Sequence, residues 1–195
     1  VKEISRIIVS TDSEEIAQIA KEHGAEVPFI RPNELAQDDS PEWLVWRHAL
    51  DYLKNQNYGI DGLIVLPATA PLREVQDVIN CIIEFEKGGV DVVITVCDAH
   101  RSPYFNMVSV DESGYSSLVF TQQKNLARRQ DAPCVFDMTT VAYVVRPQFV
   151  YEHEGVFDGK VRSIYIPAER ALDIDTPLDF EIAEYLFSKK HSSVV

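Results

Sequence analysis

Continuous apolar runs alternate along this chain with amphipathic stretches. The pattern predicts strands that alternate with helices. Continuous apolar runs predict buried strands at 6–10, 26–30, 62–66 and 90–96. Amphipathic stretches between them predict helices at 11–24, 40–53 and 74–89. Because the strands are apolar throughout, we expect an α/β fold with a mostly parallel sheet covered by helices on both faces.

Local signals mark the ends of these helices. Asp12 or Ser13 can cap the first helix, and Gly24 suits its end. Ser40 is the expected cap of the second helix, with Pro41 at its first position and Glu42 in its first turn.

After residue 100 the predicted alternation of strands and helices ends, and the chain becomes rich in predicted strands. A hairpin is predicted across 105–120, where the turn contains a glycine. Further strands are predicted at 135–145 and 163–168, and a final helix at 177–189. We therefore expect one domain over 1–195, with a β-rich insertion at about 100–165 that shapes a substrate lid or a dimer contact.

Composition and charge narrow the classes of function. The chain has 195 residues, of which 46% are hydrophobic and 25% charged, as in an ordinary globular domain. The formal charge of −13 argues against a nucleic-acid-binding face, and no apolar run approaches the roughly 18 residues of a membrane span. Three cysteines without a Cys-x-x-Cys spacing are read as reduced thiols, which predicts a cytoplasmic protein.

Two aspartates, Asp173 and Asp175, flank one isoleucine just before the last helix. If they lie on a strand, their carboxylates point to the same side, which suits Mg²⁺ or Mn²⁺ together with phosphates and water. The alternative is that Asp175 or Thr176 merely caps the helix with Asp179 as its partner. Capping explains one or two of these acids but leaves Asp173 unexplained.

Two further segments carry arginines after predicted strands. Arg73 ends the proline-rich loop "LPATAPLR" and could bind a carboxylate or a phosphate, or pair with a surface acid. Arg31 precedes the acidic loop that leads to Ser40 and Glu42 at a helix start, where free N–H groups favour anions. The simpler reading of the second segment is a capped helix after a loop.

Other chemical signals are weaker. Arg128 and Arg129 in "ARRQDAP" could bind an anionic substrate or lie on the solvated surface. The five histidines show no metal-ligand spacing, and the chain has no glycine-rich phosphate loop.

Taken together, these segments resemble the acylneuraminate cytidylyltransferases, also called CMP-sialic acid synthetases. The resemblance rests on "IVSTDSEEIAQIAKEHGAEVPFIRPNELAQDDSP", "PLR", "RRQDAP" and "DIDTPLDF", which keep the family's order and spacing over nearly the whole chain. It implies a three-layer Rossmann-like nucleotide-diphosphosugar transferase fold with a β-rich dimerisation arm, and hence a homodimer. It also implies that CTP is joined to a nine-carbon α-keto acid sugar, such as N-acetylneuraminate, with Mg²⁺.

The resemblance assigns roles by position. Asp173 and Asp175 correspond to the metal-binding pair, and Arg73 to the family's catalytic loop arginine. Arg31, Ser40 and Glu42 correspond to the segment that reads the cytosine base of CTP. Arg129, Gln130 and Tyr143 correspond to positions near the sugar.

The chain also departs from the family. Family members begin with a strand and a basic, glycine-rich loop that holds the CTP phosphates, and we expect this stretch to be missing here. Pro67 stands in place of a glutamine, Thr139-Thr140 in place of Asn-Gly, and Phe105 in place of a sugar-side lysine. We therefore expect a less polar sugar pocket. The alternatives are a metal-dependent glycosyltransferase with an Asp-x-Asp motif, or an inactive fragment or binding domain of the same fold.

Overall fold

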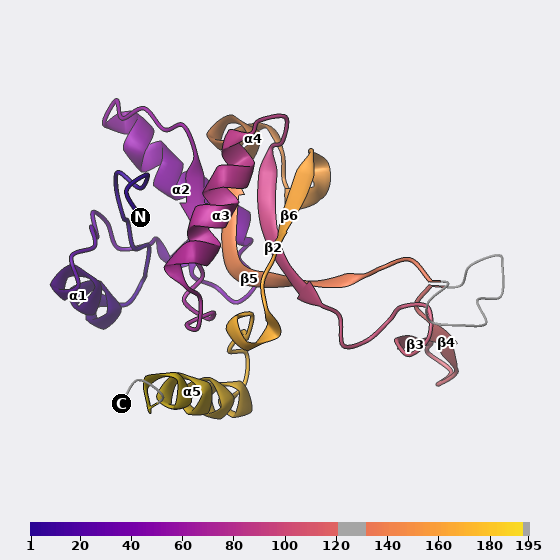
Figure 1. Ribbon diagram of the computed structural model, residues 1–195. Coiled ribbons are helices and arrows are strands. Elements are labelled where there is room, and N and C mark those ends of the chain that lie inside the picture. Colours follow the sequence, from indigo (N-terminus) through magenta and orange to yellow (C-terminus); the bar gives the residue numbers. More distant parts are fainter. Residues whose placement is uncertain (121–131, 193–195) are drawn as a thin grey trace. The chain divides into compact units, whose positions relative to one another are not determined.

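A computed structural model of the protein describes residues 1–120 and 132–192 (Figure 1). The chain divides into two compact units. Unit 1 comprises Val1–Pro67, Glu74–Ile94 and Ala142–Ile164, and unit 2 comprises Ala68–Arg73, Thr95–Val141 and Tyr165–Val195.

Helices and strands alternate along the first half, as the pattern of apolar positions predicts. The helices are α1 (Glu14–Glu22), α2 (Glu42–Asn55), α3 (Val75–Glu86), α4 (Pro147–Glu152) and α5 (Pro177–Ser192), with short 3₁₀ turns η1 (Asn33–Leu35), η3 (Val156–Asp158) and η4 (Ala168–Arg170). The strands are β1 (Leu63–Val65), β2 (Val92–Asp98), β3 (Val108–Val110), β4 (Ser116–Leu118), β5 (Phe136–Val145) and β6 (Val161–Tyr165).

Four of the strands form one sheet in the order β1-β5-β2-β6. β5 runs antiparallel to β1, with Ile64 opposite Val144. It also runs against β2, because Arg146 N–H donates to the Asp91 carbonyl near one end and Thr95 pairs with Thr139 near the other. Hydrogen bonds from Asp91 N–H to the Lys160 carbonyl and from Ile166 N–H to the Val96 carbonyl make β2 and β6 parallel. The sheet is therefore mixed, since β5 opposes its neighbours, rather than simply parallel.

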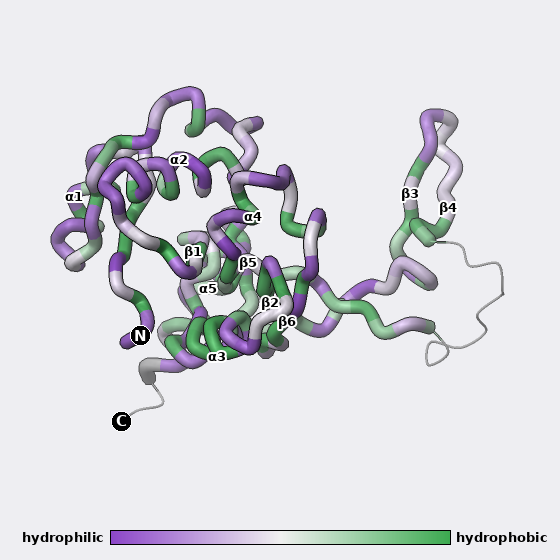
Figure 2. Tube along the Cα trace, turned by 90° about the horizontal axis from the view of Figure 1, so that it is seen from above, coloured by the Kyte–Doolittle hydropathy of each residue, from purple (hydrophilic) through white to green (hydrophobic). Residues whose placement is uncertain are grey.

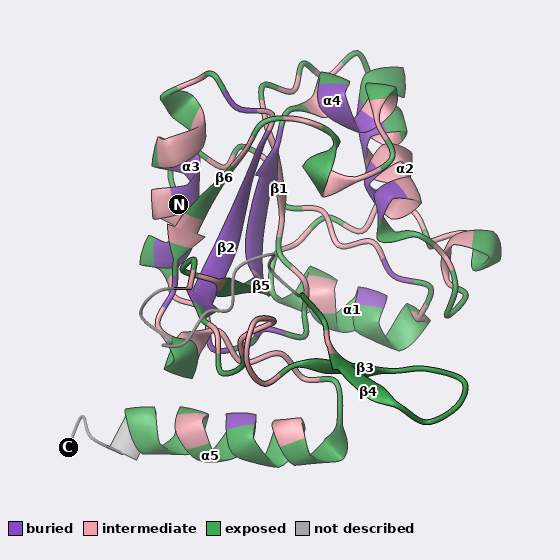
Figure 3. Cartoon of the chain, turned by 90° about the vertical axis from the view of Figure 1, so that its right-hand side faces the viewer, coloured by how far each residue is buried: buried purple, intermediate pink, exposed green. Residues whose placement is uncertain are grey.

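Helix α3 covers one face of the sheet in unit 1. Its side chains Val78, Cys81 and Ile82 form a buried cluster with residues of the sheet and its borders, namely Val90, Val93, Ala142 and Val144. Hydrophobic residues concentrate along α3 and the neighbouring strands (Figure 2), and β2 is buried over six consecutive residues (Figure 3). This apolar packing is the main source of stability that the sequence provides for unit 1.

Aromatic side chains cover the opposite face. Trp46 of α2 packs on Tyr143 of β5 with 5.5 Å between ring centroids, and Trp43 packs on Phe149 of α4 at 5.9 Å. Tyr143 alternates with Ala142 and Val144, so it points to the side of the strand away from α3. The helix, sheet and helix layers confirm the three-layer α/β fold that the resemblance implies.

Two predicted strands are wrong. Over 6–10 and 26–30 the structure has only an isolated parallel bridge between Ile8 and Glu26. Glu26 N–H donates to the Ile7 carbonyl at 2.8 Å and Val9 N–H donates to the Glu26 carbonyl at 2.9 Å. Ile7 is 59% exposed, so this apolar run does not enter the four-stranded sheet.

The predicted ends of α1 are confirmed, whereas the predicted cap of α2 is wrong. Ser13 caps α1 by accepting a hydrogen bond from Ile16 N–H, and Gly24 follows the helix with a φ of +84°, as a helix end requires. Ser40 does not cap α2, because Pro41 occupies that position without a side-chain hydrogen bond. The Ser40 hydroxyl instead donates to the Glu34 carbonyl and accepts from Gln37 N–H, so it closes the preceding loop.

The hairpin predicted across 105–120 is confirmed as β3 and β4, which form a separate two-stranded sheet. β5 and β6 belong to the four-stranded sheet, so the separate β structure is narrower than the predicted insertion over 100–165. In the described ranges, no helix is long and apolar enough to cross a membrane. Cys81, Cys97 and Cys134 are free thiols.

Asp179 stabilises the start of α5. Its Oδ2 accepts hydrogen bonds from Thr176 N–H at 2.8 Å and from the Thr176 hydroxyl at 2.7 Å. These bonds, with Thr176 as their principal source, lower the pKa of Asp179 below its usual value of 3.8. The capping role considered for Thr176 and Asp179 is therefore present.

Because the pKa of Asp179 is lowered by folding, the ionised carboxylate stabilises the folded chain only above its unfolded pKa, and this contribution is lost as pH falls through the folded pKa. We expect Asp179→Ala to lower the melting temperature at about pH 7, and the difference from the parent chain to shrink below about pH 3. Thermal unfolding followed by circular dichroism measures the melting temperatures of the variant and of the parent chain at each pH. A difference that stays constant across this range would contradict the assignment.

Candidate functional site

Asp173 and Asp175 lie in an irregular segment of unit 2 between η4 and α5. The strand predicted for them is wrong, because residues 171–175 belong to no sheet. Ile174 N–H donates to the Thr69 carbonyl at 2.9 Å, and Asp175 N–H donates to Asp179 Oδ2 at 3.3 Å. Asp173 is half-buried, whereas Asp175 is exposed.

Asp173 has an unusual environment for a carboxylate. Its Oδ1 is buried and has no hydrogen-bond partner within the described residues. Buried polar atoms in folded proteins are nearly always paired, so an exception requires an explanation such as a bound ion. Such an oxygen is a ready acceptor for a cation.

Arg73 lies on the loop that accepts the Ile174 hydrogen bond. It is half-buried, and its Nε–H donates to the Val141 carbonyl of β5 at 2.8 Å. Burial lowers the pKa of Arg73, and the negative charge of Asp173 partly offsets this effect. Two of the predicted catalytic residues, Arg73 and Asp173, thus lie in unit 2 on segments that the Ile174–Thr69 hydrogen bond joins.

The chemistry of these donors suits a hard divalent cation. Mg²⁺ is bound in proteins by one or two carboxylates together with phosphate oxygens and water. Within 1–120 and 132–192 no group of three or more histidine, cysteine, aspartate or glutamate side chains could hold a metal ion. Asp173 and Asp175 offer two carboxylates, so an ion bound to them would take its remaining ligands from a substrate and from water.

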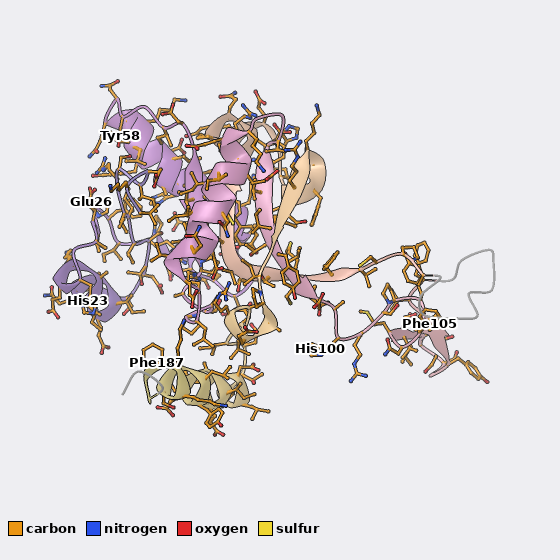
Figure 4. All side chains as sticks on the ribbon, in the orientation of Figure 1. His23, Glu26, Tyr58, His100, Phe105 and Phe187 are labelled. Atoms are coloured by element: carbon orange, nitrogen blue, oxygen red, sulfur yellow. The ribbon has the colours of Figure 1, made fainter. Side chains whose placement is uncertain are left out.

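A cavity of about 190 Å³ opens in unit 2 between the segment after β2 and the residues before β5. Its polar lining comes from His100, Arg101, Ser102 and Asn106. Its apolar lining includes Phe105, Pro133 and Val135. His100 and Phe105 both lie on the stretch between β2 and β3 (Figure 4).

The segment that lines this cavity is held by its own hydrogen bonds. Ser102 N–H donates to Asn106 Oδ1 at 2.6 Å, and three following N–H groups donate to the Ser102 carbonyl. The exposed Arg101 side chain makes no hydrogen bond or ion pair with any described residue. A cation beside an apolar wall is suited to a ligand that carries both a carboxylate and methyl groups.

Arg31, Ser40 and Glu42 lie in unit 1. The Arg31 guanidinium donates from Nε to the Ser10 hydroxyl at 3.2 Å and from Nη2 to the Ser10 carbonyl, so it fixes the segment before α1. Glu42 is exposed in the first turn of α2. Their role in reading the cytosine base stays a prediction.

Of the residues predicted near the sugar, the structure describes Tyr143. Tyr143 is only 5% exposed and packs against Trp46, which favours a structural role. Arg129 and Gln130 lie outside the described residues.

Sequence reasoning missed several residues that build these sites. The Thr69 and Val141 carbonyls are backbone acceptors, and a backbone acceptor has no residue signature. Arg101 and His100 are also missed, because a single exposed arginine or histidine is indistinguishable from a surface residue. The neighbouring Phe105, singled out as a departure from the family, was the available signal for this cavity.

Comparison with known proteins gives consistent results. A family model described as "Cytidylyltransferase" matches residues 1–192. The chain is 38% identical to the post-translational flagellin modification protein B of Campylobacter coli, over 97% of this chain and 80% of that protein. It is 36% identical to a CMP-N,N'-diacetyllegionaminic acid synthase of Campylobacter jejuni, over 98% of this chain and 81% of that protein.

A solved structure shares the fold. CMP:2-keto-3-deoxy-manno-octonic acid synthetase, solved with CTP, superposes with a TM-score of 0.66 at 14% identity, over 97% of this chain and 83% of that chain. At this identity the likeness shows the fold alone. Since the family model spans nearly the whole chain and both relatives exceed 30% identity, this chain belongs to the cytidylyltransferase family.

Proposed function

We propose that this protein joins CTP to a nonulosonic acid and releases pyrophosphate, and that its sugar is of the N,N'-diacetyllegionaminic type. The observation that carries the proposal is Asp173, whose buried Oδ1 has no hydrogen-bond partner among the described residues. Family membership supports the nucleotide transfer, and the relative at 36% identity supports the class of sugar.

The reaction balances without a further reactant. The oxygen of the sugar's anomeric hydroxyl forms a bond to the α-phosphorus of CTP, and the bond from that phosphorus to the bridging oxygen of pyrophosphate breaks. The hydroxyl proton passes to solvent or to the phosphates. Such transfers depend mainly on positioning and on neutralisation of charge.

Asp173 and Asp175 would hold a Mg²⁺ ion, with Mn²⁺ as a possible substitute. The chemistry that the ion supplies when bound is neutralisation of the phosphate charge. Asp173 contributes the buried oxygen, and the Ile174–Thr69 hydrogen bond keeps this oxygen in place. Asp175 is exposed and can reach an ion from the solvent side.

The cavity lined by Arg101 and Phe105 is suited to the sugar. The guanidinium of Arg101 can form paired hydrogen bonds with the sugar carboxylate, while the phenyl ring of Phe105 and the ring of Pro133 can contact acetyl methyl groups. Ser102 and Asn106 provide polar groups for amides. A sugar with two acetamido groups gains more from this mixed lining than a more hydroxylated sugar does.

We expect Asp173→Asn and Asp175→Asn each to lower Mg²⁺-dependent turnover at least about a hundredfold, since each removes a charged ligand at nearly constant size. Pyrophosphate release from CTP and the sugar measures turnover. The matched control is Asp111→Asn, which makes the same change at an exposed turn of the β3–β4 hairpin and should keep its turnover near that of the parent chain. Full activity in both variants would exclude the metal assignment.

For the sugar, we expect Arg101→Gln to raise the KM for the nonulosonic acid about ten- to a hundredfold, because a charge-assisted hydrogen bond is lost. The KM for CTP should stay within about twofold. Arg162→Gln, which removes an exposed arginine that pairs with Glu84, is the control.

The same assay decides the class of sugar. We expect a higher kcat/KM for N,N'-diacetyllegionaminic acid than for N-acetylneuraminic acid. A preference for N-acetylneuraminic acid would leave the nucleotide transfer intact and replace the proposed sugar. If Arg101→Gln changed the KM for CTP as much as the KM for the nonulosonic acid, Arg101 would not belong to the sugar site.

A further inference from the structure

The loop over residues 101–107, which lies between β2 and β3, is closed by its own hydrogen bonds. The Ser102 carbonyl accepts from the N–H groups of residues 105–107 at 3.0–3.1 Å. The Ser102 hydroxyl oxygen accepts from Tyr104 N–H at 3.3 Å, and Asn106 Oδ1 accepts from Ser102 N–H at 2.6 Å. The loop therefore satisfies its own N–H groups with its own oxygen atoms.

The residues that follow β4 bind the same loop. Phe120 N–H donates to the Pro103 carbonyl at 3.1 Å, and Val119 N–H donates to the Met107 carbonyl at 3.0 Å. The Phe120 ring also packs edge-on against Tyr104, with 5.2 Å between ring centroids. The loop thus has a defined shape before a ligand arrives, which lowers the conformational entropy that binding must remove.

The amide of Asn106 is oriented by this loop. Asn106 lines the cavity of unit 2, and its Oδ1 is engaged by Ser102 N–H. Its Nδ2 makes no hydrogen bond with any described residue. Because Nδ2 is a donor only, the group that Asn106 has left for a ligand is a donor.

The side chains beside Asn106 define which ligand group suits that donor. Arg101 is also a donor only, and the Ser102 hydroxyl keeps its proton for donation. Phe105 contributes an apolar wall directly next to Asn106. An acetamido group, which carries a carbonyl oxygen beside a methyl, matches a donor beside an apolar wall. A hydroxyl at the same place makes no methyl contact, and its own proton meets side chains whose free groups are donors.

We propose that Asn106 is a specificity-determining residue, and that its Nδ2 group donates a hydrogen bond to the carbonyl oxygen of an acetamido group on the sugar. The inference rests on the proposed function, in which this cavity binds the nonulosonic acid. It leaves the sugar carboxylate to Arg101 and assigns selection between acetamido and hydroxyl groups to Asn106.

The variant Asn106→Asp tests the donor without opening the loop. One carboxylate oxygen can still accept from Ser102 N–H, while the other takes the place of Nδ2. The matched control is Asn80→Asp on α3, since Asn80 is also half-buried and its Oδ1 also accepts one hydrogen bond, from Gln76 Nε2 at 2.8 Å.

The measured quantity is kcat/KM, followed by pyrophosphate release, for three sugars. These are N,N'-diacetyllegionaminic acid, N-acetylneuraminic acid, and a nonulosonic acid with hydroxyl groups in place of all acetamido groups. All three carry the carboxylate, so repulsion by the new charge lowers the three values alike and leaves their ratios unchanged. We expect kcat/KM in the parent chain to fall about tenfold at the step that removes the contacted acetamido group, and this step to disappear in Asn106→Asp and to persist in Asn80→Asp.

Hydrogen exchange of the Ser102 amide separates recognition from loop structure. The exchange should stay slow in Asn106→Asp and become faster in Asn106→Ala, which removes the acceptor as well as the donor. Asn106→Ala should also lose the preference for the acetamido group. If exchange in Asn106→Asp were as fast as in Asn106→Ala, the lost preference would reflect an open loop, and the donor assignment would be wrong.

The remaining outcomes distinguish this inference from the proposed function. If the preference survives in either Asn106 variant, or if the parent chain has none, the inference is overturned while CMP transfer stands. If the parent chain releases no pyrophosphate with any of the three sugars, both are overturned. If Asn106→Asp does not fold, Asn106→Ala decides by the same criterion, and failure of both to fold would make Asn106 a structural residue and overturn the inference.

Discussion

The hydrogen bond from Ile174 N–H to the Thr69 carbonyl joins two segments that are about a hundred residues apart in sequence, and the candidate metal site depends on it. No strand supports Asp173 and Asp175, so their backbone is held by this bond and by the bond from Asp175 N–H to Asp179 at the start of α5. The loop that carries Thr69 is stiff for a local reason, because Pro67 and Pro71 restrict its backbone. Arg73 then connects its end to β5.

The overall charge of the protein sets a second constraint. Under the proposed function both substrates are anionic, and a chain with a formal charge of −13 repels them, so their binding requires local cations. Arg101 provides one in the cavity of unit 2, where no described group pairs with its side chain. Arg73 is half-buried beside a carboxylate and contributes less to the outer field. Under the proposed function, a divalent cation at Asp173 and Asp175 supplies the charge that the side chains lack.

Much of the fold could be predicted from the sequence, because its signals are local. Ser13 and Gly24 mark the ends of α1, and the apolar run at 90–96 becomes the buried strand β2. The predictions fail where the structure depends on pairing between residues that are distant in sequence. Ile7 is apolar but exposed, and the direction of β5 depends on its neighbours in the sheet rather than on its own residues.

The same difference between local signals and long-range contacts applies to the candidate site. The Asp173–Asp175 pair is a prediction from its spacing and from the family resemblance, whereas the hydrogen bond from Ile174 N–H to the Thr69 carbonyl could not be predicted, since it depends on how two distant loops meet. Ser40 shows the opposite error. A serine before a helix start is a good cap by local rules, yet here its hydroxyl closes the turn that begins at Glu34.

Three aspartates lie within seven residues, and the sequence does not distinguish their roles. Their surroundings in the structure do. Asp179 is saturated with hydrogen bonds from Thr176, which accounts for it as a helix cap. Asp175 is exposed, and a solvated carboxylate at this place needs no partner. Among these three aspartates only Asp173 has a buried oxygen without a partner in the described residues, and the helix start does not account for it because Thr176 and Asp179 already form the cap. The cap thus accounts for Thr176 and Asp179, whereas the proposed metal site uses Asp173 and Asp175, so the two interpretations are compatible.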